Sequence, residues 1–433
     1  MSINNKSRLF SVFVVYTQCF YYLCAQNAAI MEVITRKYYA DIVDSWIGKG
    51  NIVAIVGSRR VGKSYVVKDF IQRHQDDKDA NIIYIDKEKK AFKDIRTKDD
   101  LEAWIEERFL TGKHNYILID EAQEIDHFEE SVCNWYTEEN TDVIITGSNS
   151  KMLSGELATL IAGRHVEVRI HPLTYSEFLE FHGLTDSDES LMTYLNYGGL
   201  PGLRKVGLDN DEQVWAYLSS VFNTIMLKDI IERHDIRNVP FLNNLIAFYA
   251  DTTGKLTSAN SISKYMKAQQ EDVSSNLILL YRGFYAEAYL LDVVPRYDIH
   301  GKKIFQSNEK IYWDDLGLRN LKAEGSMDSY IEKVIENAVY KHLCYLGYDV
   351  KVGVLNAGEV DFVCTKPGET IYVQASYIVA DQSTRDREFG PLEKIRDNHP
   401  KYVISATPLL TQRDENGITH LSLRKFLKEG LYS

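Results

Sequence analysis

The segment at residues 57–64, which reads Gly-Ser-Arg-Arg-Val-Gly-Lys-Ser, constrains the fold of this chain more than any other feature. It fits the pattern G-x-x-x-x-G-K-[ST], which requires a strand before it and a helix after it. An apolar run at 51–57 precedes the glycine loop, and residues 63–73 after it have helical spacing. The chain is therefore expected to be an α/β protein with a parallel sheet and a phosphate-binding loop.

Each residue type in this loop has a chemical reason to be there. Gly57 and Gly62 let the main chain curl, so that its N–H groups converge on phosphate oxygens. The N-terminus of the following helix adds partial positive charge. Lys63 can reach the β- and γ-phosphates, and Ser64 can ligate Mg²⁺. We therefore expect a bound nucleotide to contact Gly57, Ser58, Arg59, Arg60, Val61, Gly62, Lys63 and Ser64.

A second motif follows at residues 116–121, where four apolar positions end in Asp120 and Glu121. This pattern is typical of a Walker B strand, in which Asp120 holds Mg²⁺ and Glu121 orients the attacking water. A strand at 81–86 and a helix at 99–110 are expected between the two motifs. That extra unit predicts the subclass of P-loop proteins in which the Walker A and Walker B strands are not neighbours and a glutamate serves the water.

Polar residues after a fourth strand, at 142–150, are candidates for sensing the γ-phosphate. Ser148 and Asn149 lie at the carboxyl end of that strand, where ligands of open α/β sheets bind. A polar turn is the alternative interpretation. A helix is expected at 151–162, and Arg164 before a fifth strand at 165–170 could be an arginine finger for a neighbouring subunit. Arg164 could equally be a surface or ion-pair residue.

Motifs along most of the chain give it a resemblance to a known group. They lie at residues 57–64, 118–123, 145–150, 160–164, 172–178, 198–201, 228–230, 315–319, 335–337, 359–362 and 387–401. Together they resemble the prokaryotic AAA+-type P-loop ATPases that carry an uncharacterised conserved C-terminal domain. The resemblance implies that the nucleotide is ATP and that ATP is hydrolysed with Mg²⁺. It names no macromolecular substrate.

The sequence divides into five expected segments. Residues 1–30 form an N-terminal extension, 31–204 an ATPase core of the AAA+/ASCE type, and 205–240 a helical lid. Residues 241–310 are expected to form a winged helix and 311–433 a small α/β domain. Arg233 in the lid could reach back to the nucleotide, although a lone helical arginine is more often solvated. The nucleotide cycle would then switch the position of the C-terminal domains.

The sequence of the winged-helix segment is compatible with DNA binding and with protein contact. Residues 261–266 and 273–281 are expected to be successive helices, and His300-Gly301 marks a hairpin. In DNA-binding versions the second helix enters the major groove. Residues 255–310 contain eight Lys/Arg and six Asp/Glu, and the recognition helix carries only Arg282. Packing or protein contact is therefore as reasonable an interpretation as DNA binding.

The last third has the element order of the PD-(D/E)xK nuclease fold: a helix at 330–343, three strands, a helix and a strand. Glu336 and Asp361 match its first two acidic positions, which in active members hold Mg²⁺. Gln374-Ala-Ser376 stands where an acid and a lysine are needed. Ser376 cannot stabilise a developing negative charge as lysine would. We expect a restriction-endonuclease-like domain that is inactive.

The net charge and the cysteine positions limit which partners and which cellular compartment are expected. The net charge of −12 excludes a general polyanion binder, so any DNA contact must be local. The five cysteines show no metal spacing, which favours a reduced cytoplasm. Residues 9–24 resemble a secretory signal but are too short and too polar for a firm membrane span. We interpret Met31 as the true start. An unidentified protein partner and a homo-oligomer remain expectations.

Overall fold

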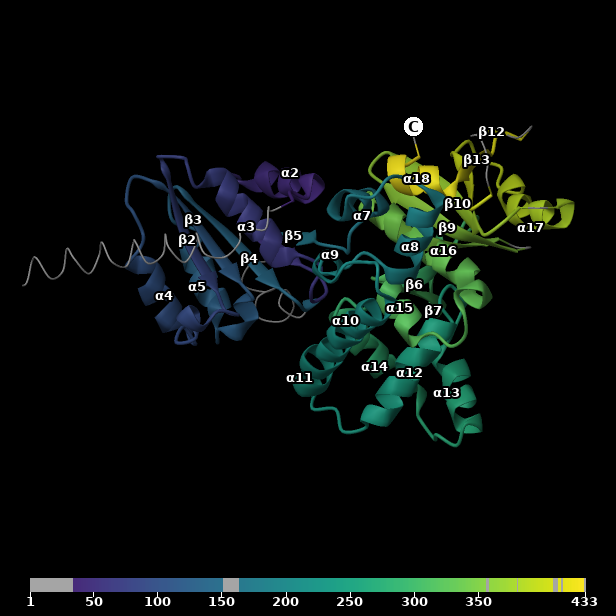
Figure 1. Ribbon diagram of the computed structural model, residues 1–433, viewed down its shortest axis with the longest axis horizontal. Coiled ribbons are helices and arrows are strands. Elements are labelled where there is room, and N and C mark those ends of the chain that lie inside the picture. The colour runs from purple at the N-terminus through teal and green to yellow at the C-terminus, as the bar shows by residue number, and fades with distance from the viewer. Residues whose placement is uncertain are drawn as a thin grey trace, which may run out of the picture.

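The computed structural model describes residues 34–150, 163–355, 358–379, 381–407, 412–413 and 416–431. The N-terminal extension at 1–30 and the helix expected at 151–162 lie outside these residues. Figure 1 shows two sheets with a group of helices between and below them.

The first sheet has five parallel strands in the order β2-β3-β4-β1-β5. Its strands are β1 (Ile52–Val56), β2 (Ala80–Asp86), β3 (His114–Asp120), β4 (Thr141–Gly147) and β5 (His165–Arg169). The order confirms the expected parallel α/β sheet and the separation of the two motif strands. The strand that separates them is β4, which follows both motifs in the sequence, whereas β2 lies at the edge of the sheet.

Helices cover both faces of this sheet. Val53 and Ile55 pack in one core with Val67 and Phe70 of α3 (Lys63–His74), and α2 (Lys37–Trp46) joins the same face. The alternate residues of β1 pack in another core with α4 (Lys98–Glu106) and α5 (Phe128–Trp135). Because both faces are covered, every residue of β1 is buried. Short 3-10 turns η1 (Lys90–Phe92) and η2 (Ala122–Glu124) complete this unit.

A helical region follows the first sheet. Its elements are α7 (Tyr175–His182), α8 (Asp188–Tyr197), α9 (Leu203–Val206), α10 (Asp211–Thr224), the π-helical segment η4 (Ile225–Ile231), α11 (Glu232–His234), α12 (Val239–Asp251), α13 (Ala259–Ala268) and α14 (Ser275–Glu287). Asn210 caps α10 and Asn238 caps α12 through their side-chain oxygens. Helices therefore occupy the stretch at 205–240, as the sequence predicts.

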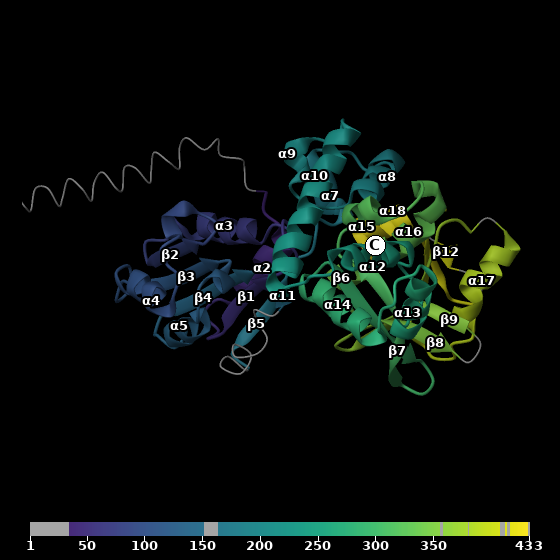
Figure 2. The same ribbon diagram turned by 90° about the horizontal axis from the view of Figure 1, so that it is seen from below.

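The second sheet has eight strands in the order β12-β13-β11-β10-β9-β8-β6-β7. Its strands are β6 (Leu291–Asp298), β7 (Lys303–Trp313), β8 (Asp349–Leu355), β9 (Gly358–Lys366), β10 (Glu369–Ser376), β11 (Lys401–Ser405), β12 (Gln412–Arg413) and β13 (Thr419–Ser422). Helices α15 (Leu316–Lys322), α16 (Met327–Tyr345), α17 (Gln382–Glu393) and α18 (Leu423–Glu429) accompany it. The two views in Figures 1 and 2 place this unit away from the first sheet.

The hairpin of β6 and β7 belongs to this second sheet. Arg296 on β6 pairs in parallel with Val352 on β8, so the hairpin continues the C-terminal strands. The boundary expected between residues 310 and 311 falls inside β7. The turn signal at His300-Gly301 is local, whereas the pairing with β8 joins residues more than fifty positions apart and leaves no local pattern.

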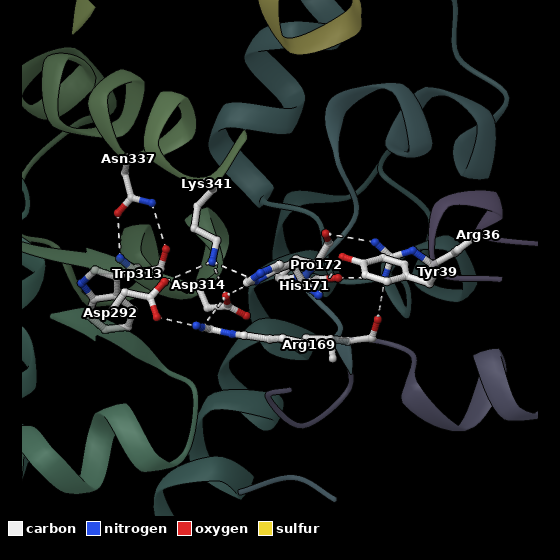
Figure 3. A network of polar contacts seen from close by, with 11 residues as sticks. Arg36, Tyr39, Arg169, His171, Pro172, Asp292, Trp313, Asp314, Asn337 and Lys341 are labelled. Carbon is white, nitrogen blue, oxygen red and sulfur yellow. Dashed lines mark hydrogen bonds and ion pairs between the residues drawn. The ribbon is translucent and has the colours of Figure 1, made fainter. Parts of the chain in front are cut away.

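The two sheets are linked by a buried network of charges (Figure 3). Arg169, at the end of β5, donates to Asp292 on β6 at 2.8 Å and to Asp314 after β7 at 3.2 Å. Lys341 on α16 contacts both carboxylates. Asn337 pairs with both main-chain polar groups of Trp313, at 2.8 and 2.9 Å. The carboxyl end of β5 is thus fixed against the second sheet.

No helix within the described part of the chain is long and apolar enough to cross a membrane.

Candidate nucleotide site

The glycine loop between β1 and α3 is held in a conformation that only small residues fit. Gly57 has φ of 145°, and a Cβ there would lie 2.3 Å from the carbonyl oxygen of Ile170. Gly62 has φ of 106° and precedes α3 without a side-chain cap. The first N–H groups of α3 are therefore left for a ligand at that helix end. Arg36 supports the loop from behind, donating to the Val61 carbonyl oxygen at 3.2 Å.

Lys63 lies at the centre of the loop, almost fully buried. Its ammonium donates to the main-chain oxygens of Gly57 and Ser58 at 3.0 Å each and lies 3.9 Å from Glu121 Oε1. Burial lowers the pKa of Lys63, while Glu121 and Asp120 oppose that shift. The Ser58 hydroxyl is buried and has no hydrogen-bond partner among the described residues. A phosphate oxygen accepts hydrogen bonds from an ammonium and from a hydroxyl alike, so both side chains suit a phosphate group.

Asp120 lies directly beneath the loop at the end of β3. It accepts a hydrogen bond from the Thr146 hydroxyl at 2.5 Å and a longer one from the Tyr84 hydroxyl at 3.4 Å. Burial raises the pKa of Asp120, and hydrogen bonds from Thr146 and Ser64 partly offset that rise. Ser64 and Asp120 are thus adjacent, and their two oxygens suit Mg²⁺. Sequence reasoning missed Thr146 and Tyr84, which hold the carboxylate in place.

Glu121 follows in a left-handed conformation, with φ of 56°. This conformation is uncommon outside glycine and concentrates at functional sites. Its N–H donates to the Thr146 hydroxyl at 3.0 Å, and its carboxylate accepts a hydrogen bond from Gln123. The other carboxylate oxygen, Oε1, lies 3.9 Å from the Lys63 ammonium. A carboxylate so placed can hold a water molecule near the loop.

The sensor candidates lie at the same edge of the sheet. Ser148 and Asn149 are fully buried after β4. The Ser148 hydroxyl lies 3.4 Å from Asp229 Oδ1, and Arg59 of the glycine loop donates to both oxygens of Asp229 at 2.8 and 2.9 Å. Asp229 was missed as a site residue. The segment at 228–230 is one of the motifs that carry the family resemblance, but sequence reasoning assigned Asp229 no role in the site.

A cavity of about 600 Å³ opens beside the loop. Its volume is in the range of small-molecule sites. It is lined by seven cationic and three acidic residues, which favours an anionic ligand. Apolar side chains also line the cavity and come from α2, α7, the 201–206 segment and α10; they include Ala40, Phe181, Pro201, Tyr217 and Val221. The helical segment at 205–240 thus provides one wall.

Two arginines considered from the sequence lie elsewhere. Arg164 precedes β5, and the parallel register sets His165 beside Ile52, so Arg164 is at the edge of the sheet opposite the loop. Its exposed side chain lies 5.9 Å from the ring centre of Tyr136. Arg164 does not join the site of its own chain. Arg233 is not among the cavity residues; the cations on that wall are Arg204 and Lys205.

A second cluster of charges lies in the C-terminal sheet. Lys310 on β7 contacts Glu336 at 2.9 Å, Glu359 at 2.7 Å and Asp361 at 3.1 Å. Gln374 accepts from the Asp361 N–H at 3.2 Å. The structure therefore brings Glu336, Asp361 and Gln374 together, as expected, but with a lysine that sequence reasoning missed.

Lys310 fills the centre of these carboxylates. Its ammonium is almost fully buried, and its three acidic partners raise its pKa despite burial, which alone would lower it. Within the described ranges, no group of three His, Cys, Asp or Glu side chains is arranged to hold a metal ion. The one signal for Lys310 in the sequence is a charge directly before the apolar residues Ile311 to Trp313.

The helices α12 to α14 and the hairpin follow the element order expected of a winged helix. Arg282, the only arginine of α14, forms an ion pair with Glu309 of β7. The exposed residues of α14 include Leu279 and Leu280. The arginine is therefore neutralised within the chain, and the exposed face of α14 is largely aliphatic.

Comparison with known proteins finds a family match over the residues of the first sheet. Residues 49–179 match the model of an AAA domain, and residues 188–328 match a domain of unknown function (DUF8612). An uncharacterized protein of Haemophilus influenzae is 32% identical over 381 residues, which cover 86% of this chain and 93% of that protein. An uncharacterized protein of Methanocaldococcus jannaschii is 27% identical over 360 residues, which cover 79% of this chain and 78% of that protein.

Among solved structures, the Walker-type ATPase of Pyrococcus abyssi is similar, with a TM-score of 0.48 and 14% identity, over 66% of this chain and 95% of that one. The family match at 49–179 covers the glycine loop, Asp120, Glu121 and the end of β4. The chain therefore belongs to the same family as the Haemophilus influenzae protein, and its residues 49–179, which contain the first sheet, match an AAA domain.

Proposed function

We propose that this protein binds ATP at the glycine loop and hydrolyses it with Mg²⁺. The observation that carries the proposal is the convergence of Lys63, Ser64 and Glu121 on one cavity, with Asp120 directly behind them. The loop amides and Lys63 hold the phosphates, and Ser64 and Asp120 hold the metal ion. Mg²⁺ supplies charge neutralisation of the phosphates when it is bound.

Glu121 acts on the water that attacks the γ-phosphate. Its carboxylate faces the loop and has Lys63 3.9 Å away, so it is positioned at the phosphate end of the cavity. From there it accepts a hydrogen bond from water and orients the oxygen. The apolar part of the cavity, with Phe181 and Tyr217, is where the base is held. The preference for adenine follows from the family, because the loop itself recognises only phosphate.

Two variants test this assignment. Lys63→Ala is expected to abolish ATP binding, because it removes the buried ammonium. Glu121→Gln is expected to keep binding and lower turnover by about 10²–10⁴-fold, the usual contribution of a general base. Binding is measured by calorimetry with Mg²⁺ and turnover by phosphate release. Lys267→Ala, which changes an exposed lysine on α13, is the control. Unchanged hydrolysis in both site variants defeats the proposal.

We propose that the cycle of ATP binding and hydrolysis changes the position of the C-terminal domains relative to the nucleotide site. Pro201 lines the cavity, while the neighbouring Gly199 accepts no side chain and donates to Asp315 of the second unit at 2.8 Å. A change at the cavity can therefore reach the C-terminal half through three residues. A slow nucleotide switch is the alternative: ADP that stays bound through purification favours the switch, and fast exchange favours a motor-like ATPase.

We propose that α14 contacts protein rather than DNA. The pairing of Arg282 with Glu309 and the exposure of Leu279 and Leu280 support this choice. Duplex binding that weakens steeply with salt would contradict it, because such binding reports phosphate contacts.

Arg164 is proposed to act only on a neighbouring subunit. Capture of partners by Glu121→Gln with ATP would identify what the protein acts upon.

The C-terminal sheet is proposed to be a scaffold and not an active nuclease. Lys310 forms ion pairs with Glu336 and Asp361, the carboxylates that an active nuclease of this fold uses to hold metal ions. Plasmid cleavage that is lost in Glu336→Ala and in Asp361→Ala would contradict this proposal.

A further inference from the structure

Asp229 is a buried carboxylate that binds Arg59, one of the residues lining the nucleotide cavity. It lies on η4 (Ile225–Ile231) and is 1% exposed. The carboxylate binds Arg59 through two hydrogen bonds, of 2.8 and 2.9 Å, and its Oδ1 lies 3.4 Å from the Ser148 hydroxyl. Arg59 comes from the glycine loop and Ser148 from the end of β4. The helical wall thus places an anion between the two elements that face a nucleotide.

The partners of Asp229 are chemically suited to phosphate. A guanidinium binds a carboxylate or a phosphate with the same two-pronged geometry. Arg59 lines the cavity together with Lys63, Ser64 and Glu121, so it borders the space proposed to hold the triphosphate. Hydrogen bonding to Asp229 raises the pKa of Arg59, although burial opposes the shift. The arginine is therefore charged and held by the helical wall.

The backbone of η4 supports a conformational role. Seven residues form a π-helix between α10 and α11, and such segments are infrequent and concentrate at functional sites. Residues of α10 that precede it, including Tyr217 and Val221, line the cavity. A shift of Asp229 would therefore reach the α10 residues that line the cavity.

We propose that Asp229 stands in for the γ-phosphate, and that bound ATP competes with it for Arg59 and Ser148 and so releases η4. This inference rests on the proposed binding of ATP at the glycine loop. ADP lacks the third phosphate and leaves the ion pair in place. Asp229 is a positioning residue: it acts through Arg59 and makes the helical wall respond to the nucleotide state.

The test uses the full-length protein and Asp229→Asn, which keeps the shape and removes the charge. Without the competing anion, the Kd for ATP is expected to fall by about tenfold, and the Kd for ADP by less than about threefold. Asp235→Asn is the matched control, since Asp235 forms an ion pair with Arg237 in which both side chains are about 90% exposed. Its two Kd values are expected to stay unchanged.

A second measurement follows the motion of η4 directly, in the natural sequence and in the variant. Amide hydrogen exchange of residues 225–231 in the natural sequence is expected to be faster with the slowly hydrolysed analogue ATPγS than with ADP. In Asp229→Asn the two nucleotides should give the same exchange. Equal exchange with both nucleotides in the natural sequence, or an unchanged ratio of the ATP and ADP Kd values in the variant, overturns the inference. Failure of the unaltered protein to bind either nucleotide would instead overturn the proposed function.

Discussion

His342 is buried and His171 and His182 are half-buried, so water stabilises an imidazolium there less than it does in solution. Burial lowers the pKa of each to about 4. The ring of His342 packs edge-on against Phe426, and its Nε2 has no hydrogen-bond partner among the residues that the structure describes. Each folded-state pKa lies below the value of about 6.5 in the unfolded chain. The stability that these rings contribute is present above pH 6.5 and is lost as the pH falls through 4.

Replacing His342 by Phe removes one of these titrations and keeps an aromatic ring. The unfolding free energy should then depend less steeply on pH between 6.5 and 4, by about 1.4 kcal/mol per pH unit, which corresponds to one proton. Urea unfolding at several pH values measures the slope. Met192→Leu, which changes an exposed side chain that does not titrate, is the control and should leave the slope unchanged. An identical slope for His342→Phe and the natural sequence would refute this prediction.

At the scale of elements, two motifs that the family resemblance left without a role pack against each other. A Cβ on Gly198 would lie 2.6 Å from the Asp315 carboxylate, and one on Gly199 would lie 2.3 Å from the Leu173 carbonyl oxygen. Asp315 caps α15 through the Leu318 N–H at 2.9 Å and accepts from the Gly199 N–H. The segments at 198–201 and 315–319 therefore join the nucleotide unit to the second sheet by close main-chain contact.

Gly199→Ala should lower the unfolding free energy by more than about 3 kcal/mol, because the added methyl group meets main chain that cannot move away. Chemical denaturation measures the change. Gly283→Ala is the control: Gly283 lies within α14, and nothing is within 4 Å of an added Cβ. A gain of about 0.5–1 kcal/mol is expected there. Similar effects of the two substitutions would show that the contact is not restrictive.

At the scale of the whole molecule, the charge network of Figure 3 joins the two sheets. Arg169 and Lys341 neutralise Asp292 and Asp314, all largely shielded from water. Burial alone would lower the pKa of Lys341, and the two carboxylates instead hold it above the ordinary value. Arg36 extends the connection, since it binds both the carbonyl oxygen of Val61 in the glycine loop and that of His171.

Lys341→Met should destabilise the protein by about 3–5 kcal/mol, because it leaves buried carboxylates with too little positive charge. Lys267→Met removes an exposed partner of Asp272 and should change stability by less than about 1 kcal/mol. Denaturation followed by fluorescence compares the two variants. Limited proteolysis of Lys341→Met should also cut faster between the two sheets. Equal stability of the two variants would mean that the network does not hold the sheets together.

Much of the nucleotide unit could be predicted from the sequence. The glycine loop, the acidic pair at the end of β3 and the positions of the five strands are local patterns, set by residues close together in the sequence. The same holds for the helices at 205–240 and for the hairpin turn at His300-Gly301. Because these patterns depend on spacing within a few residues, they can be recognised without knowledge of the rest of the chain.

The sequence by itself determined the phosphate-binding loop and the α/β class, because glycine conformation and apolar periodicity act locally. Only the tertiary structure decided the partners: Asp229 for Arg59, Lys310 for Glu336 and Asp361, and β8 for the hairpin. It also set Arg164 at the edge away from the loop. Such pairs form between residues up to 170 positions apart, and the choice depends on strand register and on which buried charge needs neutralising.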